Sequence, residues 1–289
     1  MITALIRRYP VVIYVAVAFG IAWGGVALVA GLFGASLFVV FIPMAAGPTT
    51  ASLMLTGVLD GKQGYRELLA RLARWRVAPR WYAVALLLNP LVTLAVLGIL
   101  YFTTSRAFAP GIFATDNPTA LVGLALTGGL AAGLFEELGW TGFATPRLLA
   151  RRHFAAAGAM LGVVWAAWHI GPEFSGASAW GDHRIGRILL WMFAGMIPFR
   201  ILMTWVYRNS RSLFVGVLMH ASYTGGQVLL EPINVSHTDS LLWWGLVGAG
   251  LAIVAGIVIV LDRRDDTLRA IRRRAEREAR KGVHDAQYV

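Results

Sequence analysis

The chain has 289 residues, of which 57% are hydrophobic and 14% are charged, and its mean hydropathy is +0.64. Soluble domains average roughly 45–50% apolar and 25% charged residues, so this composition excludes an ordinary soluble protein and indicates an integral membrane protein. The formal net charge of +11 does not indicate a nucleic-acid partner, because the basic residues are placed as membrane topology requires. The chain has no cysteine, which excludes thiol nucleophiles, disulfides and thiolate metal sites.

Eight apolar stretches approach the roughly 20 residues that a helix needs to cross a bilayer. They cover residues 11–33, 36–58, 82–103, 119–145, 155–172, 185–206, 212–230 and 241–261. The sequence therefore predicts an all-α polytopic protein with about eight transmembrane helices. We expect residues 1–262 to form a single transmembrane domain and residues 263–289 to form a basic cytoplasmic tail. Residues 62–82 and 263–281 have the pattern of interfacial helices that lie on an anionic leaflet.

Basic residues gather in every second connection between the predicted helices. With the N-terminus in the cytoplasm, one side receives Arg7, Arg8, Lys62, Arg66, Arg71, Arg74, Arg76, Arg80, Arg147, Arg151, Arg152, Arg208, Arg211 and the Arg-rich tail. Only Arg106, Arg184 and Arg187 fall on the opposite side. The positive-inside rule then predicts a multi-pass protein of the cell membrane with both termini cytoplasmic and anionic inner-leaflet lipids as partners.

A few ionisable residues lie at membrane depth. Glu136 and Glu137 end the uncharged run 119–135, and His169, Arg200 and His220 lie within later apolar stretches. A charge at the bilayer centre costs about 2.5–3.5 kcal/mol on insertion scales, so such residues usually face one another or a wet cavity. One alternative is that they only pair to hold helices together, but five such residues on four helices favour a functional cavity.

Helical spacing restricts how the two glutamates can point. Neighbouring helical residues lie about 100° apart around the axis, so one of Glu136 and Glu137 should face the cavity and the other should orient it or face a neighbouring helix. Gly129 and Gly133 form a small-residue face that lets another backbone approach closely beside them.

Two further helices carry polar residues along one face. Trp165 and His169 are four residues apart, so the indole can shield and orient the imidazole. His220, Thr224 and Gln227 share a face in the same way.

The distances from basic residues set the depth of the cavity. Glu136 precedes Arg147 by 11 residues, about 16 Å along a helix, which predicts a cavity facing the cytoplasm. His169 follows Arg152 by 17 residues, which is too deep for that cavity unless the fifth helix begins well after Arg152, for example at Gly158.

Three motifs in this order resemble a known family. Residues 136–141 read EELGWT, residues 165–169 read WAAWH, and residues 220–224 read HASYT. They resemble the patterns Glu-Glu-x-x-x-Arg, Phe-x-x-x-His and His-x-x-x-Asn of the type II CAAX prenyl endopeptidase and bacteriocin-processing family, also called CPBP or Abi proteins. In this chain threonine replaces both the arginine and the asparagine, and tryptophan replaces the phenylalanine. The family-like core covers about residues 119–230.

The resemblance implies hydrolysis of a peptide bond in a membrane cavity by a glutamate-activated water. It gives Glu136 the role of general base, His169 that of holding or polarising the water, and His220 that of stabilising the oxyanion. Thr224 occupies the position of the asparagine that assists this histidine, and Gln227 is one turn away as an alternative amide.

Two cofactor states fit the resemblance. Glu136, His169 and His220 would form a Zn²⁺ set of two histidines and one carboxylate with an open fourth position, which would leave Glu137 as the base. A metal-free site would instead need Glu136 tuned by its surroundings to act as a base at neutral pH.

The arginine that the first motif lacks has two candidate replacements. Arg200 lies inside the membrane, about two turns before Arg208, and we expect it to pair with Glu137. Arg147 is nearer in sequence, but its position at a helix end favours a lipid headgroup contact.

Three functions follow from these residues. The first is an intramembrane endopeptidase, of glutamate or metalloprotease type, that acts on a small membrane-associated peptide or protein. The second is a non-catalytic family member that works as a scaffold or bacteriocin immunity protein, for which the motif replacements argue. The third is a proton-coupled transporter in which the carboxylates and histidines form a relay. The paired broken helices that a transporter fold predicts are not evident in the sequence.

Overall fold

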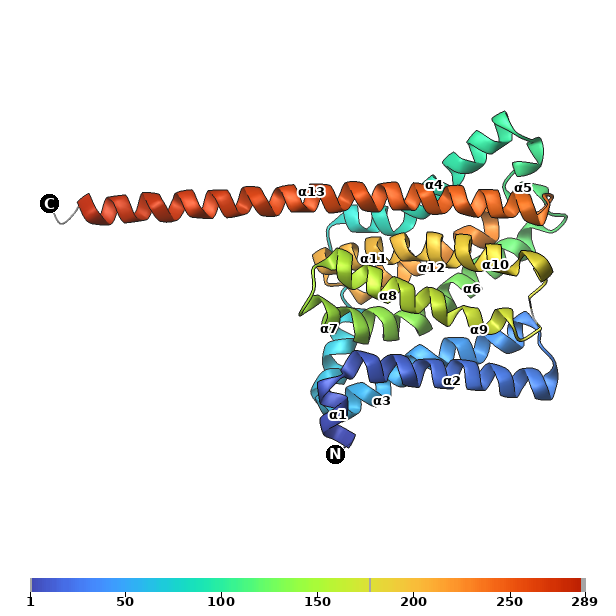
Figure 1. Ribbon diagram of the computed structural model, residues 1–289, viewed down its shortest axis with the longest axis horizontal. Coiled ribbons are helices and arrows are strands. Elements are labelled where there is room, and N and C mark those ends of the chain that lie inside the picture. Colours follow the sequence, from blue (N-terminus) through green and yellow to red (C-terminus); the bar gives the residue numbers. More distant parts are fainter. Residues whose placement is uncertain (1, 177, 287–289) are drawn as a thin grey trace. The chain divides into compact units, whose positions relative to one another are not determined.

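The computed structural model describes residues 2–176 and 178–286 (Figure 1). Within these residues, eight helices are long and apolar enough to cross a membrane, as the sequence predicted, and there is no strand. The chain divides into one compact unit, Met1–Ala252, and a second, Ile253–Val289. The predicted basic tail falls in the second unit, and its side chains from residue 264 onward lie outside the described residues.

Helices follow one another with short connections. In chain order they are α1 (Ile2–Arg8), α2 (Pro10–Phe33), α3 (Leu37–Leu72), α4 (Pro79–Thr103), η1 (Arg106–Phe108), α5 (Gly111–Ala114), α6 (Pro118–Gly139), η2 (Trp140–Ala144), α7 (Thr145–Leu149), α8 (Phe154–Trp168), α9 (Ile170–Glu173), η3 (Gly181–His183), α10 (Arg184–Arg187), η4 (Ile188–Met196), α11 (Ile197–Ser210), α12 (Leu213–Leu230) and α13 (His237–Ala286).

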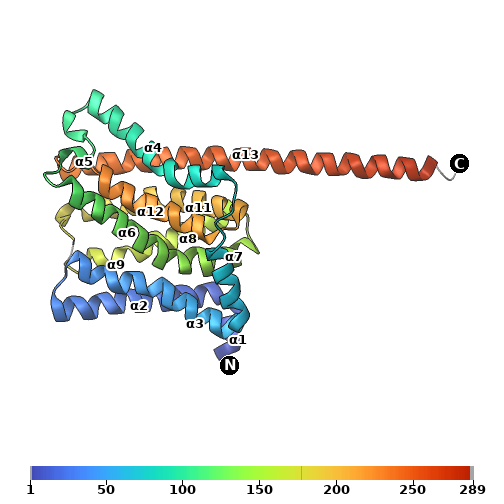
Figure 2. The ribbon, with the colours of Figure 1, turned by 180° about the vertical axis from the view of Figure 1, so that it is seen from behind.

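The first unit has two chemically different ends. The helices α1 and α7 lie at the left in Figure 1, and α5, α9 and α10 lie at the right, an arrangement that the view from behind also shows (Figure 2). We call the first the basic end, because it carries Arg8, Arg147, Arg151 and Arg152, and we call the second the α9 end.

Helix α3 joins a predicted membrane span to the predicted interfacial segment. It changes direction at Gly61, whose φ of +58° and ψ of −147° suit a residue without a side chain. Beyond that glycine the helix continues to Leu72, where the sequence predicted an amphipathic stretch as far as residue 82. Leu68 is buried against Leu213 and Val217, so this stretch packs onto the protein as well as presenting exposed residues.

Glycine faces bring together the helices that carry the ionisable residues. A Cβ added to Gly129 would lie 2.6 Å from the carbonyl oxygen of Ala221, and one added to Gly133 would lie 2.5 Å from that of Val217. These contacts hold α6 against α12, as the small-residue pattern predicted. The backbones can approach this closely only because neither position carries a side chain.

Helices α8 and α11 meet through a second glycine face. A Cβ on Gly158 would lie 2.6 Å from the Cα of Ile201, and one on Gly162 would lie 2.8 Å from the Cα of Ile197. Gly158 therefore serves helix packing. It does not begin the fifth helix, because α8 starts at Phe154.

We predict that Gly133→Ala destabilises the protein and that Gly128→Ala does not. The added methyl group at position 133 must push α12 away, and overpacking of this kind typically costs about 1–3 kcal/mol. No atom lies within 4 Å of a Cβ at Gly128, on the same helix, so alanine there should be neutral or slightly stabilising. Thermal unfolding in detergent checks both variants, and equal melting temperatures would contradict this account of the α6–α12 contact.

Two widened π-helical segments flank the ionisable residues. The segment η2 separates the glutamates on α6 from Pro146 in α7, and η4 precedes Pro198 in α11. A proline inside a helix lacks an N–H and its ring clashes with the carbonyl four residues earlier, so a local change in helix winding accommodates it. The carbonyl of Trp140 accepts both the backbone N–H and the side-chain hydroxyl of Thr145 at the end of η2.

Candidate active site

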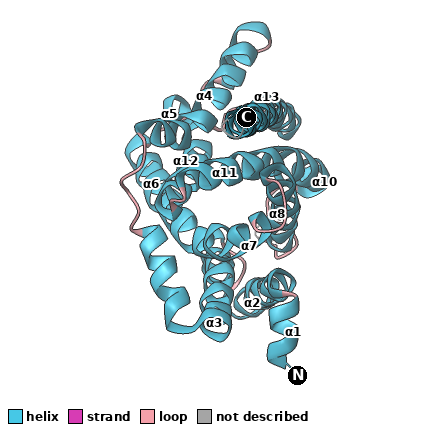
Figure 3. Ribbon diagram, turned by 90° about the vertical axis from the view of Figure 1, so that its left-hand side faces the viewer, coloured by secondary structure: helices cyan, strands magenta, loops and turns pink. Residues whose placement is uncertain are grey.

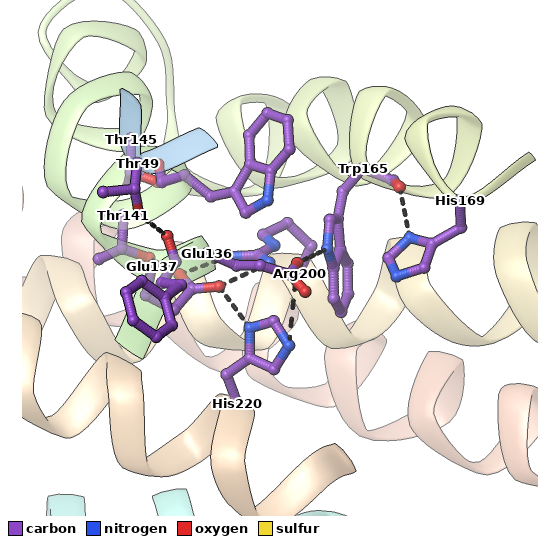
Figure 4. A network of polar contacts seen from close by, with 11 residues as sticks. Thr49, Glu136, Glu137, Thr141, Thr145, Trp165, His169, Arg200 and His220 are labelled. Carbon is purple, nitrogen blue, oxygen red and sulfur yellow. Dashed lines mark hydrogen bonds and ion pairs between the residues drawn. The ribbon is translucent and has the colours of Figure 1, made fainter. Parts of the chain in front are cut away.

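Glu137 is the centre of a buried polar network. It is 0% exposed, as is Arg200, whose Nη1 and Nη2 donate to the two carboxylate oxygens at 2.8 and 2.9 Å (Figure 4). The hydroxyl of Thr141 donates to the same carboxylate, and Nδ1 of His220 lies 2.7 Å from its Oε1. This two-pronged pairing neutralises a carboxylate that would otherwise be too costly to bury. Glu137 is therefore held in one position and has no free oxygen with which to act as a base.

Glu136 has a different environment. Its Oε2 accepts a hydrogen bond of 2.9 Å from the indole nitrogen of Trp165, and Nε2 of His220 lies 4.0 Å from the same oxygen. Its Oε1 makes no hydrogen bond to the described residues, and Glu136 lines a pocket. The two adjacent glutamates thus diverge as their helical spacing requires.

His220 connects the two glutamates. Its Nδ1 contacts Glu137, and its Nε2 faces Glu136. Because a carboxylate accepts a hydrogen at Nδ1, the contact fixes the orientation of the ring and leaves Nε2 as the nitrogen directed at the pocket. The gap of 4.0 Å between Nε2 and Glu136 is longer than a direct hydrogen bond.

His169 lies beyond Trp165 as seen from the glutamates (Figure 4). Its Nδ1 is 2.8 Å from the carbonyl oxygen of Trp165, and the centres of the two rings are 5.4 Å apart. The indole therefore touches the histidine, as their spacing predicted, and also stands between it and Glu136. Trp165 also packs against Arg200, whose guanidinium carbon lies 4.2 Å from the centre of the indole ring.

One pocket of about 260 Å³ receives most of the predicted site residues. Its lining includes Glu136, His169, His220, Thr224 and Gln227, together with Trp165. The sequence predicted a cavity that faces the same side as the basic residues, but the pocket extends to Glu173, Ser178 and Arg187 at the α9 end. The physical reason is that α8 begins at Phe154, two residues after Arg152, so that His169, which directly follows the last residue of α8, lies near the opposite end.

Gln227 and Trp168 both line the pocket with a donor that has no hydrogen-bond partner. The Oε1 of Gln227 accepts from the indole of Trp191 at 3.3 Å, while its Nε2 is buried without a hydrogen-bond partner. A buried amide nitrogen without a partner costs free energy, so its position in a pocket indicates a place for a ligand oxygen or water.

Arg147 is placed apart from the glutamates. It pairs with Asp60 at 2.5 Å, donates to the carbonyl of Phe143 and packs over the ring of Phe143. Arg200, and not Arg147, therefore provides the guanidinium for Glu137.

Sequence reasoning missed a second charged cluster at the α9 end. Glu173 is 3% exposed and forms an ion pair with Arg187, and Ser178 donates to it at 2.5 Å. Arg187 also packs against Trp191 and interacts electrostatically with Glu231. Glu173, Ser178 and Glu231 lie in connections between the predicted spans. The signal that could have identified them is that a glutamate directly follows the apolar stretch 155–172.

We predict that Glu231→Gln stabilises the protein at neutral pH. Burial raises the pKa of the Glu231 carboxyl, and nearby Arg187 and the Trp244 indole offset this only in part. The ionised side chain therefore opposes folding above its unfolded pKa of about 4.3, and the protonated form does not. The melting temperature of the variant should exceed that of the wild type at pH 7, and the difference should vanish below about pH 4. A lower melting temperature at pH 7 would show that attraction to Arg187 outweighs burial.

Comparison with known proteins shows that the segment carrying the site is similar to one family. Residues 118–225 match the family model described as Type II CAAX prenyl endopeptidase Rce1-like. A stretch of 140 residues is 27% identical to the CAAX prenyl protease 2 of Methanococcus maripaludis and covers 47% of this chain and 48% of that protein. The segment that carries the site is similar to this family. The resemblance drawn from the three motifs is thereby confirmed, while the chain spans about half the length of the curated relative.

The structure gives a physical account of two departures from the family motifs. At the arginine position, Thr141 donates its hydroxyl to Glu137, and Arg200 brings the guanidinium from a different helix. At the phenylalanine position, the indole of Trp165 adds a donor that a phenyl ring lacks and directs it at Glu136.

The donor groups of this site do not fit the zinc set that the sequence allowed. Zn²⁺ needs its ligands around one point at about 2.0–2.2 Å, but the ring of Trp165 separates His169 from Glu136 and His220 (Figure 4). Among the described residues, no three His, Asp or Glu side chains are grouped closely enough to hold a metal ion.

Proposed function

We propose that the chain is an intramembrane endopeptidase in which Glu136 activates the attacking water. The observation that carries the proposal is that Glu136 lines a pocket and has one oxygen held by Trp165, while the other makes no hydrogen bond to the described residues. A general base must lie within hydrogen-bond reach of the proton that it removes, and Oε1 can hold a water in this way. The similarity of residues 118–225 to a peptidase family supports the same reaction.

The reaction divides into two proton transfers. Glu136 takes a proton from water as the oxygen attacks the carbonyl carbon of the peptide bond, which gives a tetrahedral oxyanion. Glu136 then returns that proton to the leaving nitrogen as the C–N bond breaks, so that the products are a carboxylic acid and an amine. Glu137 does not exchange protons in this scheme, and its role is to fix Nδ1 of His220.

Several donors of the pocket serve the oxyanion. His220 contributes when its Nε2 carries a proton, and the hydroxyl of Thr224 and the amide of Gln227 line the same pocket. The unpartnered Nε2 of Gln227 makes it the strongest replacement for the family's asparagine. A single oxyanion donor is worth about 10²–10³ in rate in other hydrolases.

The substrate we propose is a small membrane-associated peptide or a segment of a membrane protein. The pocket lies among membrane-spanning helices and has apolar walls that include Phe41, Met44 and Trp168. The relative named CAAX prenyl protease 2 supports a peptide substrate without defining its sequence.

Incubation of the purified protein in liposomes with a library of membrane-inserted peptides tests the proposal, with mass spectrometry to locate cleavage sites. Cleavage at defined bonds, absent in the Glu136→Gln variant, is the expected result. A folded wild type that produces no fragments above the background of the variant would favour the scaffold or immunity function, for which the motif replacements argue.

We predict that removal of metal ions leaves the activity unchanged. The proposed water is held by Glu136 without a metal, because the donors of the zinc set are not grouped. Treatment with a chelator followed by dialysis should therefore preserve cleavage, and the purified protein should contain far less than one zinc per chain. Loss of activity that zinc alone restores would establish the metalloprotease alternative.

A further inference from the structure

A second pocket, separate from the candidate active site, lies at the basic end of the first unit, and we call it the arginine pocket. Its volume is about 360 Å³, and among the described residues its lining contains Arg8, Arg147, Arg151 and Arg152 but no Asp or Glu. The arginines come from two separate parts of the chain, the end of α1 and the segment that joins α7 to α8. Figure 3, which views the first unit from the basic end, shows α1, α2, α7 and α8 at this face.

Three of the four arginines have no counter-charge within the protein. Arg147 is paired with Asp60. The side chains of Arg8, Arg151 and Arg152 are exposed and form no ion pair or hydrogen bond with the described residues. Like charges gathered around one pocket repel one another and oppose the compact fold. An anion bound between them would remove that repulsion.

The neighbouring pocket at the same end has a different charge balance. Its volume is about 580 Å³, and its lining combines four arginines with the carboxylates of Asp60 and Glu67. Part of the positive charge there is therefore neutralised by the protein itself. The need for an anion from outside the protein is greater in the arginine pocket.

The arginine pocket also has an apolar wall. Val12 on α2 and Met160 on α8 line it and are exposed. Both lie within candidate membrane spans, which begin at Pro10 and Phe154. At 1.5 Å per residue, Met160 lies about 9 Å along α8 from Phe154. The pocket thus joins a cluster of cations at the end of the spans to exposed apolar side chains at the depth of the acyl chains.

We propose that the arginine pocket binds an anionic phospholipid, with its phosphate on Arg8, Arg151 and Arg152 and an acyl chain along Val12 and Met160. A guanidinium can bind phosphate through two parallel N–H donors, and basic pockets between membrane helices suit lipid headgroups. A free phosphate ion would balance the charge but would leave the apolar wall uncovered. The bound lipid joins the start of α2 to the α7–α8 segment, and this site is independent of the proposed peptidase activity.

Thermal unfolding in lipid vesicles tests the site. Wild type is compared with Arg8→Gln/Arg152→Gln and with the matched control Lys62→Gln/Arg66→Gln, which removes the same charge from exposed residues outside the arginine pocket. Adding phosphatidylglycerol to phosphatidylcholine vesicles should raise the melting temperature of wild type and control by several degrees, and that of Arg8→Gln/Arg152→Gln much less. In phosphatidylcholine alone, Arg8→Gln/Arg152→Gln should melt at or above the wild type, because part of the repulsion is gone.

Native mass spectrometry gives a second readout of the same proteins. Wild type and control released from the mixed vesicles should retain a phosphatidylglycerol adduct that Arg8→Gln/Arg152→Gln lacks.

Each other result overturns the proposal. Equal effects of phosphatidylglycerol on both double variants would show only a diffuse attraction between the membrane and positive charge. Melting of Arg8→Gln/Arg152→Gln below the wild type in phosphatidylcholine alone would show that these arginines serve the fold itself. An equal stabilisation of the detergent-solubilised wild type by inorganic phosphate would show an ion site in place of a lipid site.

Discussion

Replacement of Glu136 by glutamine is expected to lower the rate of peptide cleavage by about 10²–10⁴-fold, the contribution typical of a positioned general base. Glutamine retains an oxygen that can accept the indole hydrogen bond of Trp165, so the local packing should persist. It cannot take a proton from water. The reaction therefore loses its base while the fold is retained, and the loss should appear in kcat more than in KM.

The matched control for this variant is Glu67→Gln. Glu67 lies on the exposed surface of α3 beyond Gly61, so the same change of charge there should leave the cleavage rate close to that of the wild type. Melting temperatures of both variants should match the wild type. Cleavage activity of Glu136→Gln near the wild-type level would show that Glu136 is not the general base of the reaction.

Replacement of Arg200 by glutamine is expected to destabilise the protein by about 3–5 kcal/mol, because it leaves the buried carboxylate of Glu137 without its counter-charge. This is a large share of the roughly 5–15 kcal/mol that stabilises a typical fold. The variant should have a strongly lowered melting temperature and a lower expression level. Its cleavage activity should also fall, because Glu137 fixes the ring of His220.

Two comparisons separate loss of the ion pair from a general effect of removing an arginine. Arg151→Gln changes an exposed arginine of the basic end and should alter stability by less than about 0.5 kcal/mol. The double variant Glu137→Gln/Arg200→Met removes both buried charges and should recover part of the stability lost in the single variant. Equal stability of Arg200→Gln and the wild type would contradict the importance of the pair.

The polar core of the site could be predicted from the sequence because charged residues in an apolar chain are few. An ionisable side chain at membrane depth needs a partner to offset the cost of its burial. The structure brings four of them into one network, namely Glu136, Glu137, Arg200 and His220. The pairing of Arg200 with Glu137 was expected because the first motif lacks its arginine and Arg200 lies inside the membrane. His169 was harder to place, since a lone histidine near a helix end can be satisfied by a backbone carbonyl, as it is here.

The charged cluster at the α9 end could not be predicted in the same way. Glu173 and Arg187 lie beside connections, where charged residues are ordinarily solvated and carry no signal. Their burial depends on how α9, α10 and the loop between them fold back onto the pocket. The pattern of apolar and polar residues within one segment does not show how that segment folds back onto another.

Composition and hydrophobic length by themselves determined that this is a membrane protein with eight helices able to cross a bilayer among its described residues, because the cost of placing polar groups in lipid leaves few alternatives. The same cost marked the ionisable residues of the site, and three motifs predicted the family of the segment that holds them. Only the tertiary structure decided which glutamate has an oxygen without a hydrogen bond to the described residues. It also decided that Trp165 separates His169 from Glu136 and His220, and that the pocket extends to the α9 end. These features depend on contacts between side chains distant in the sequence, set by glycine faces and by the direction of each helix, which a helical period does not specify.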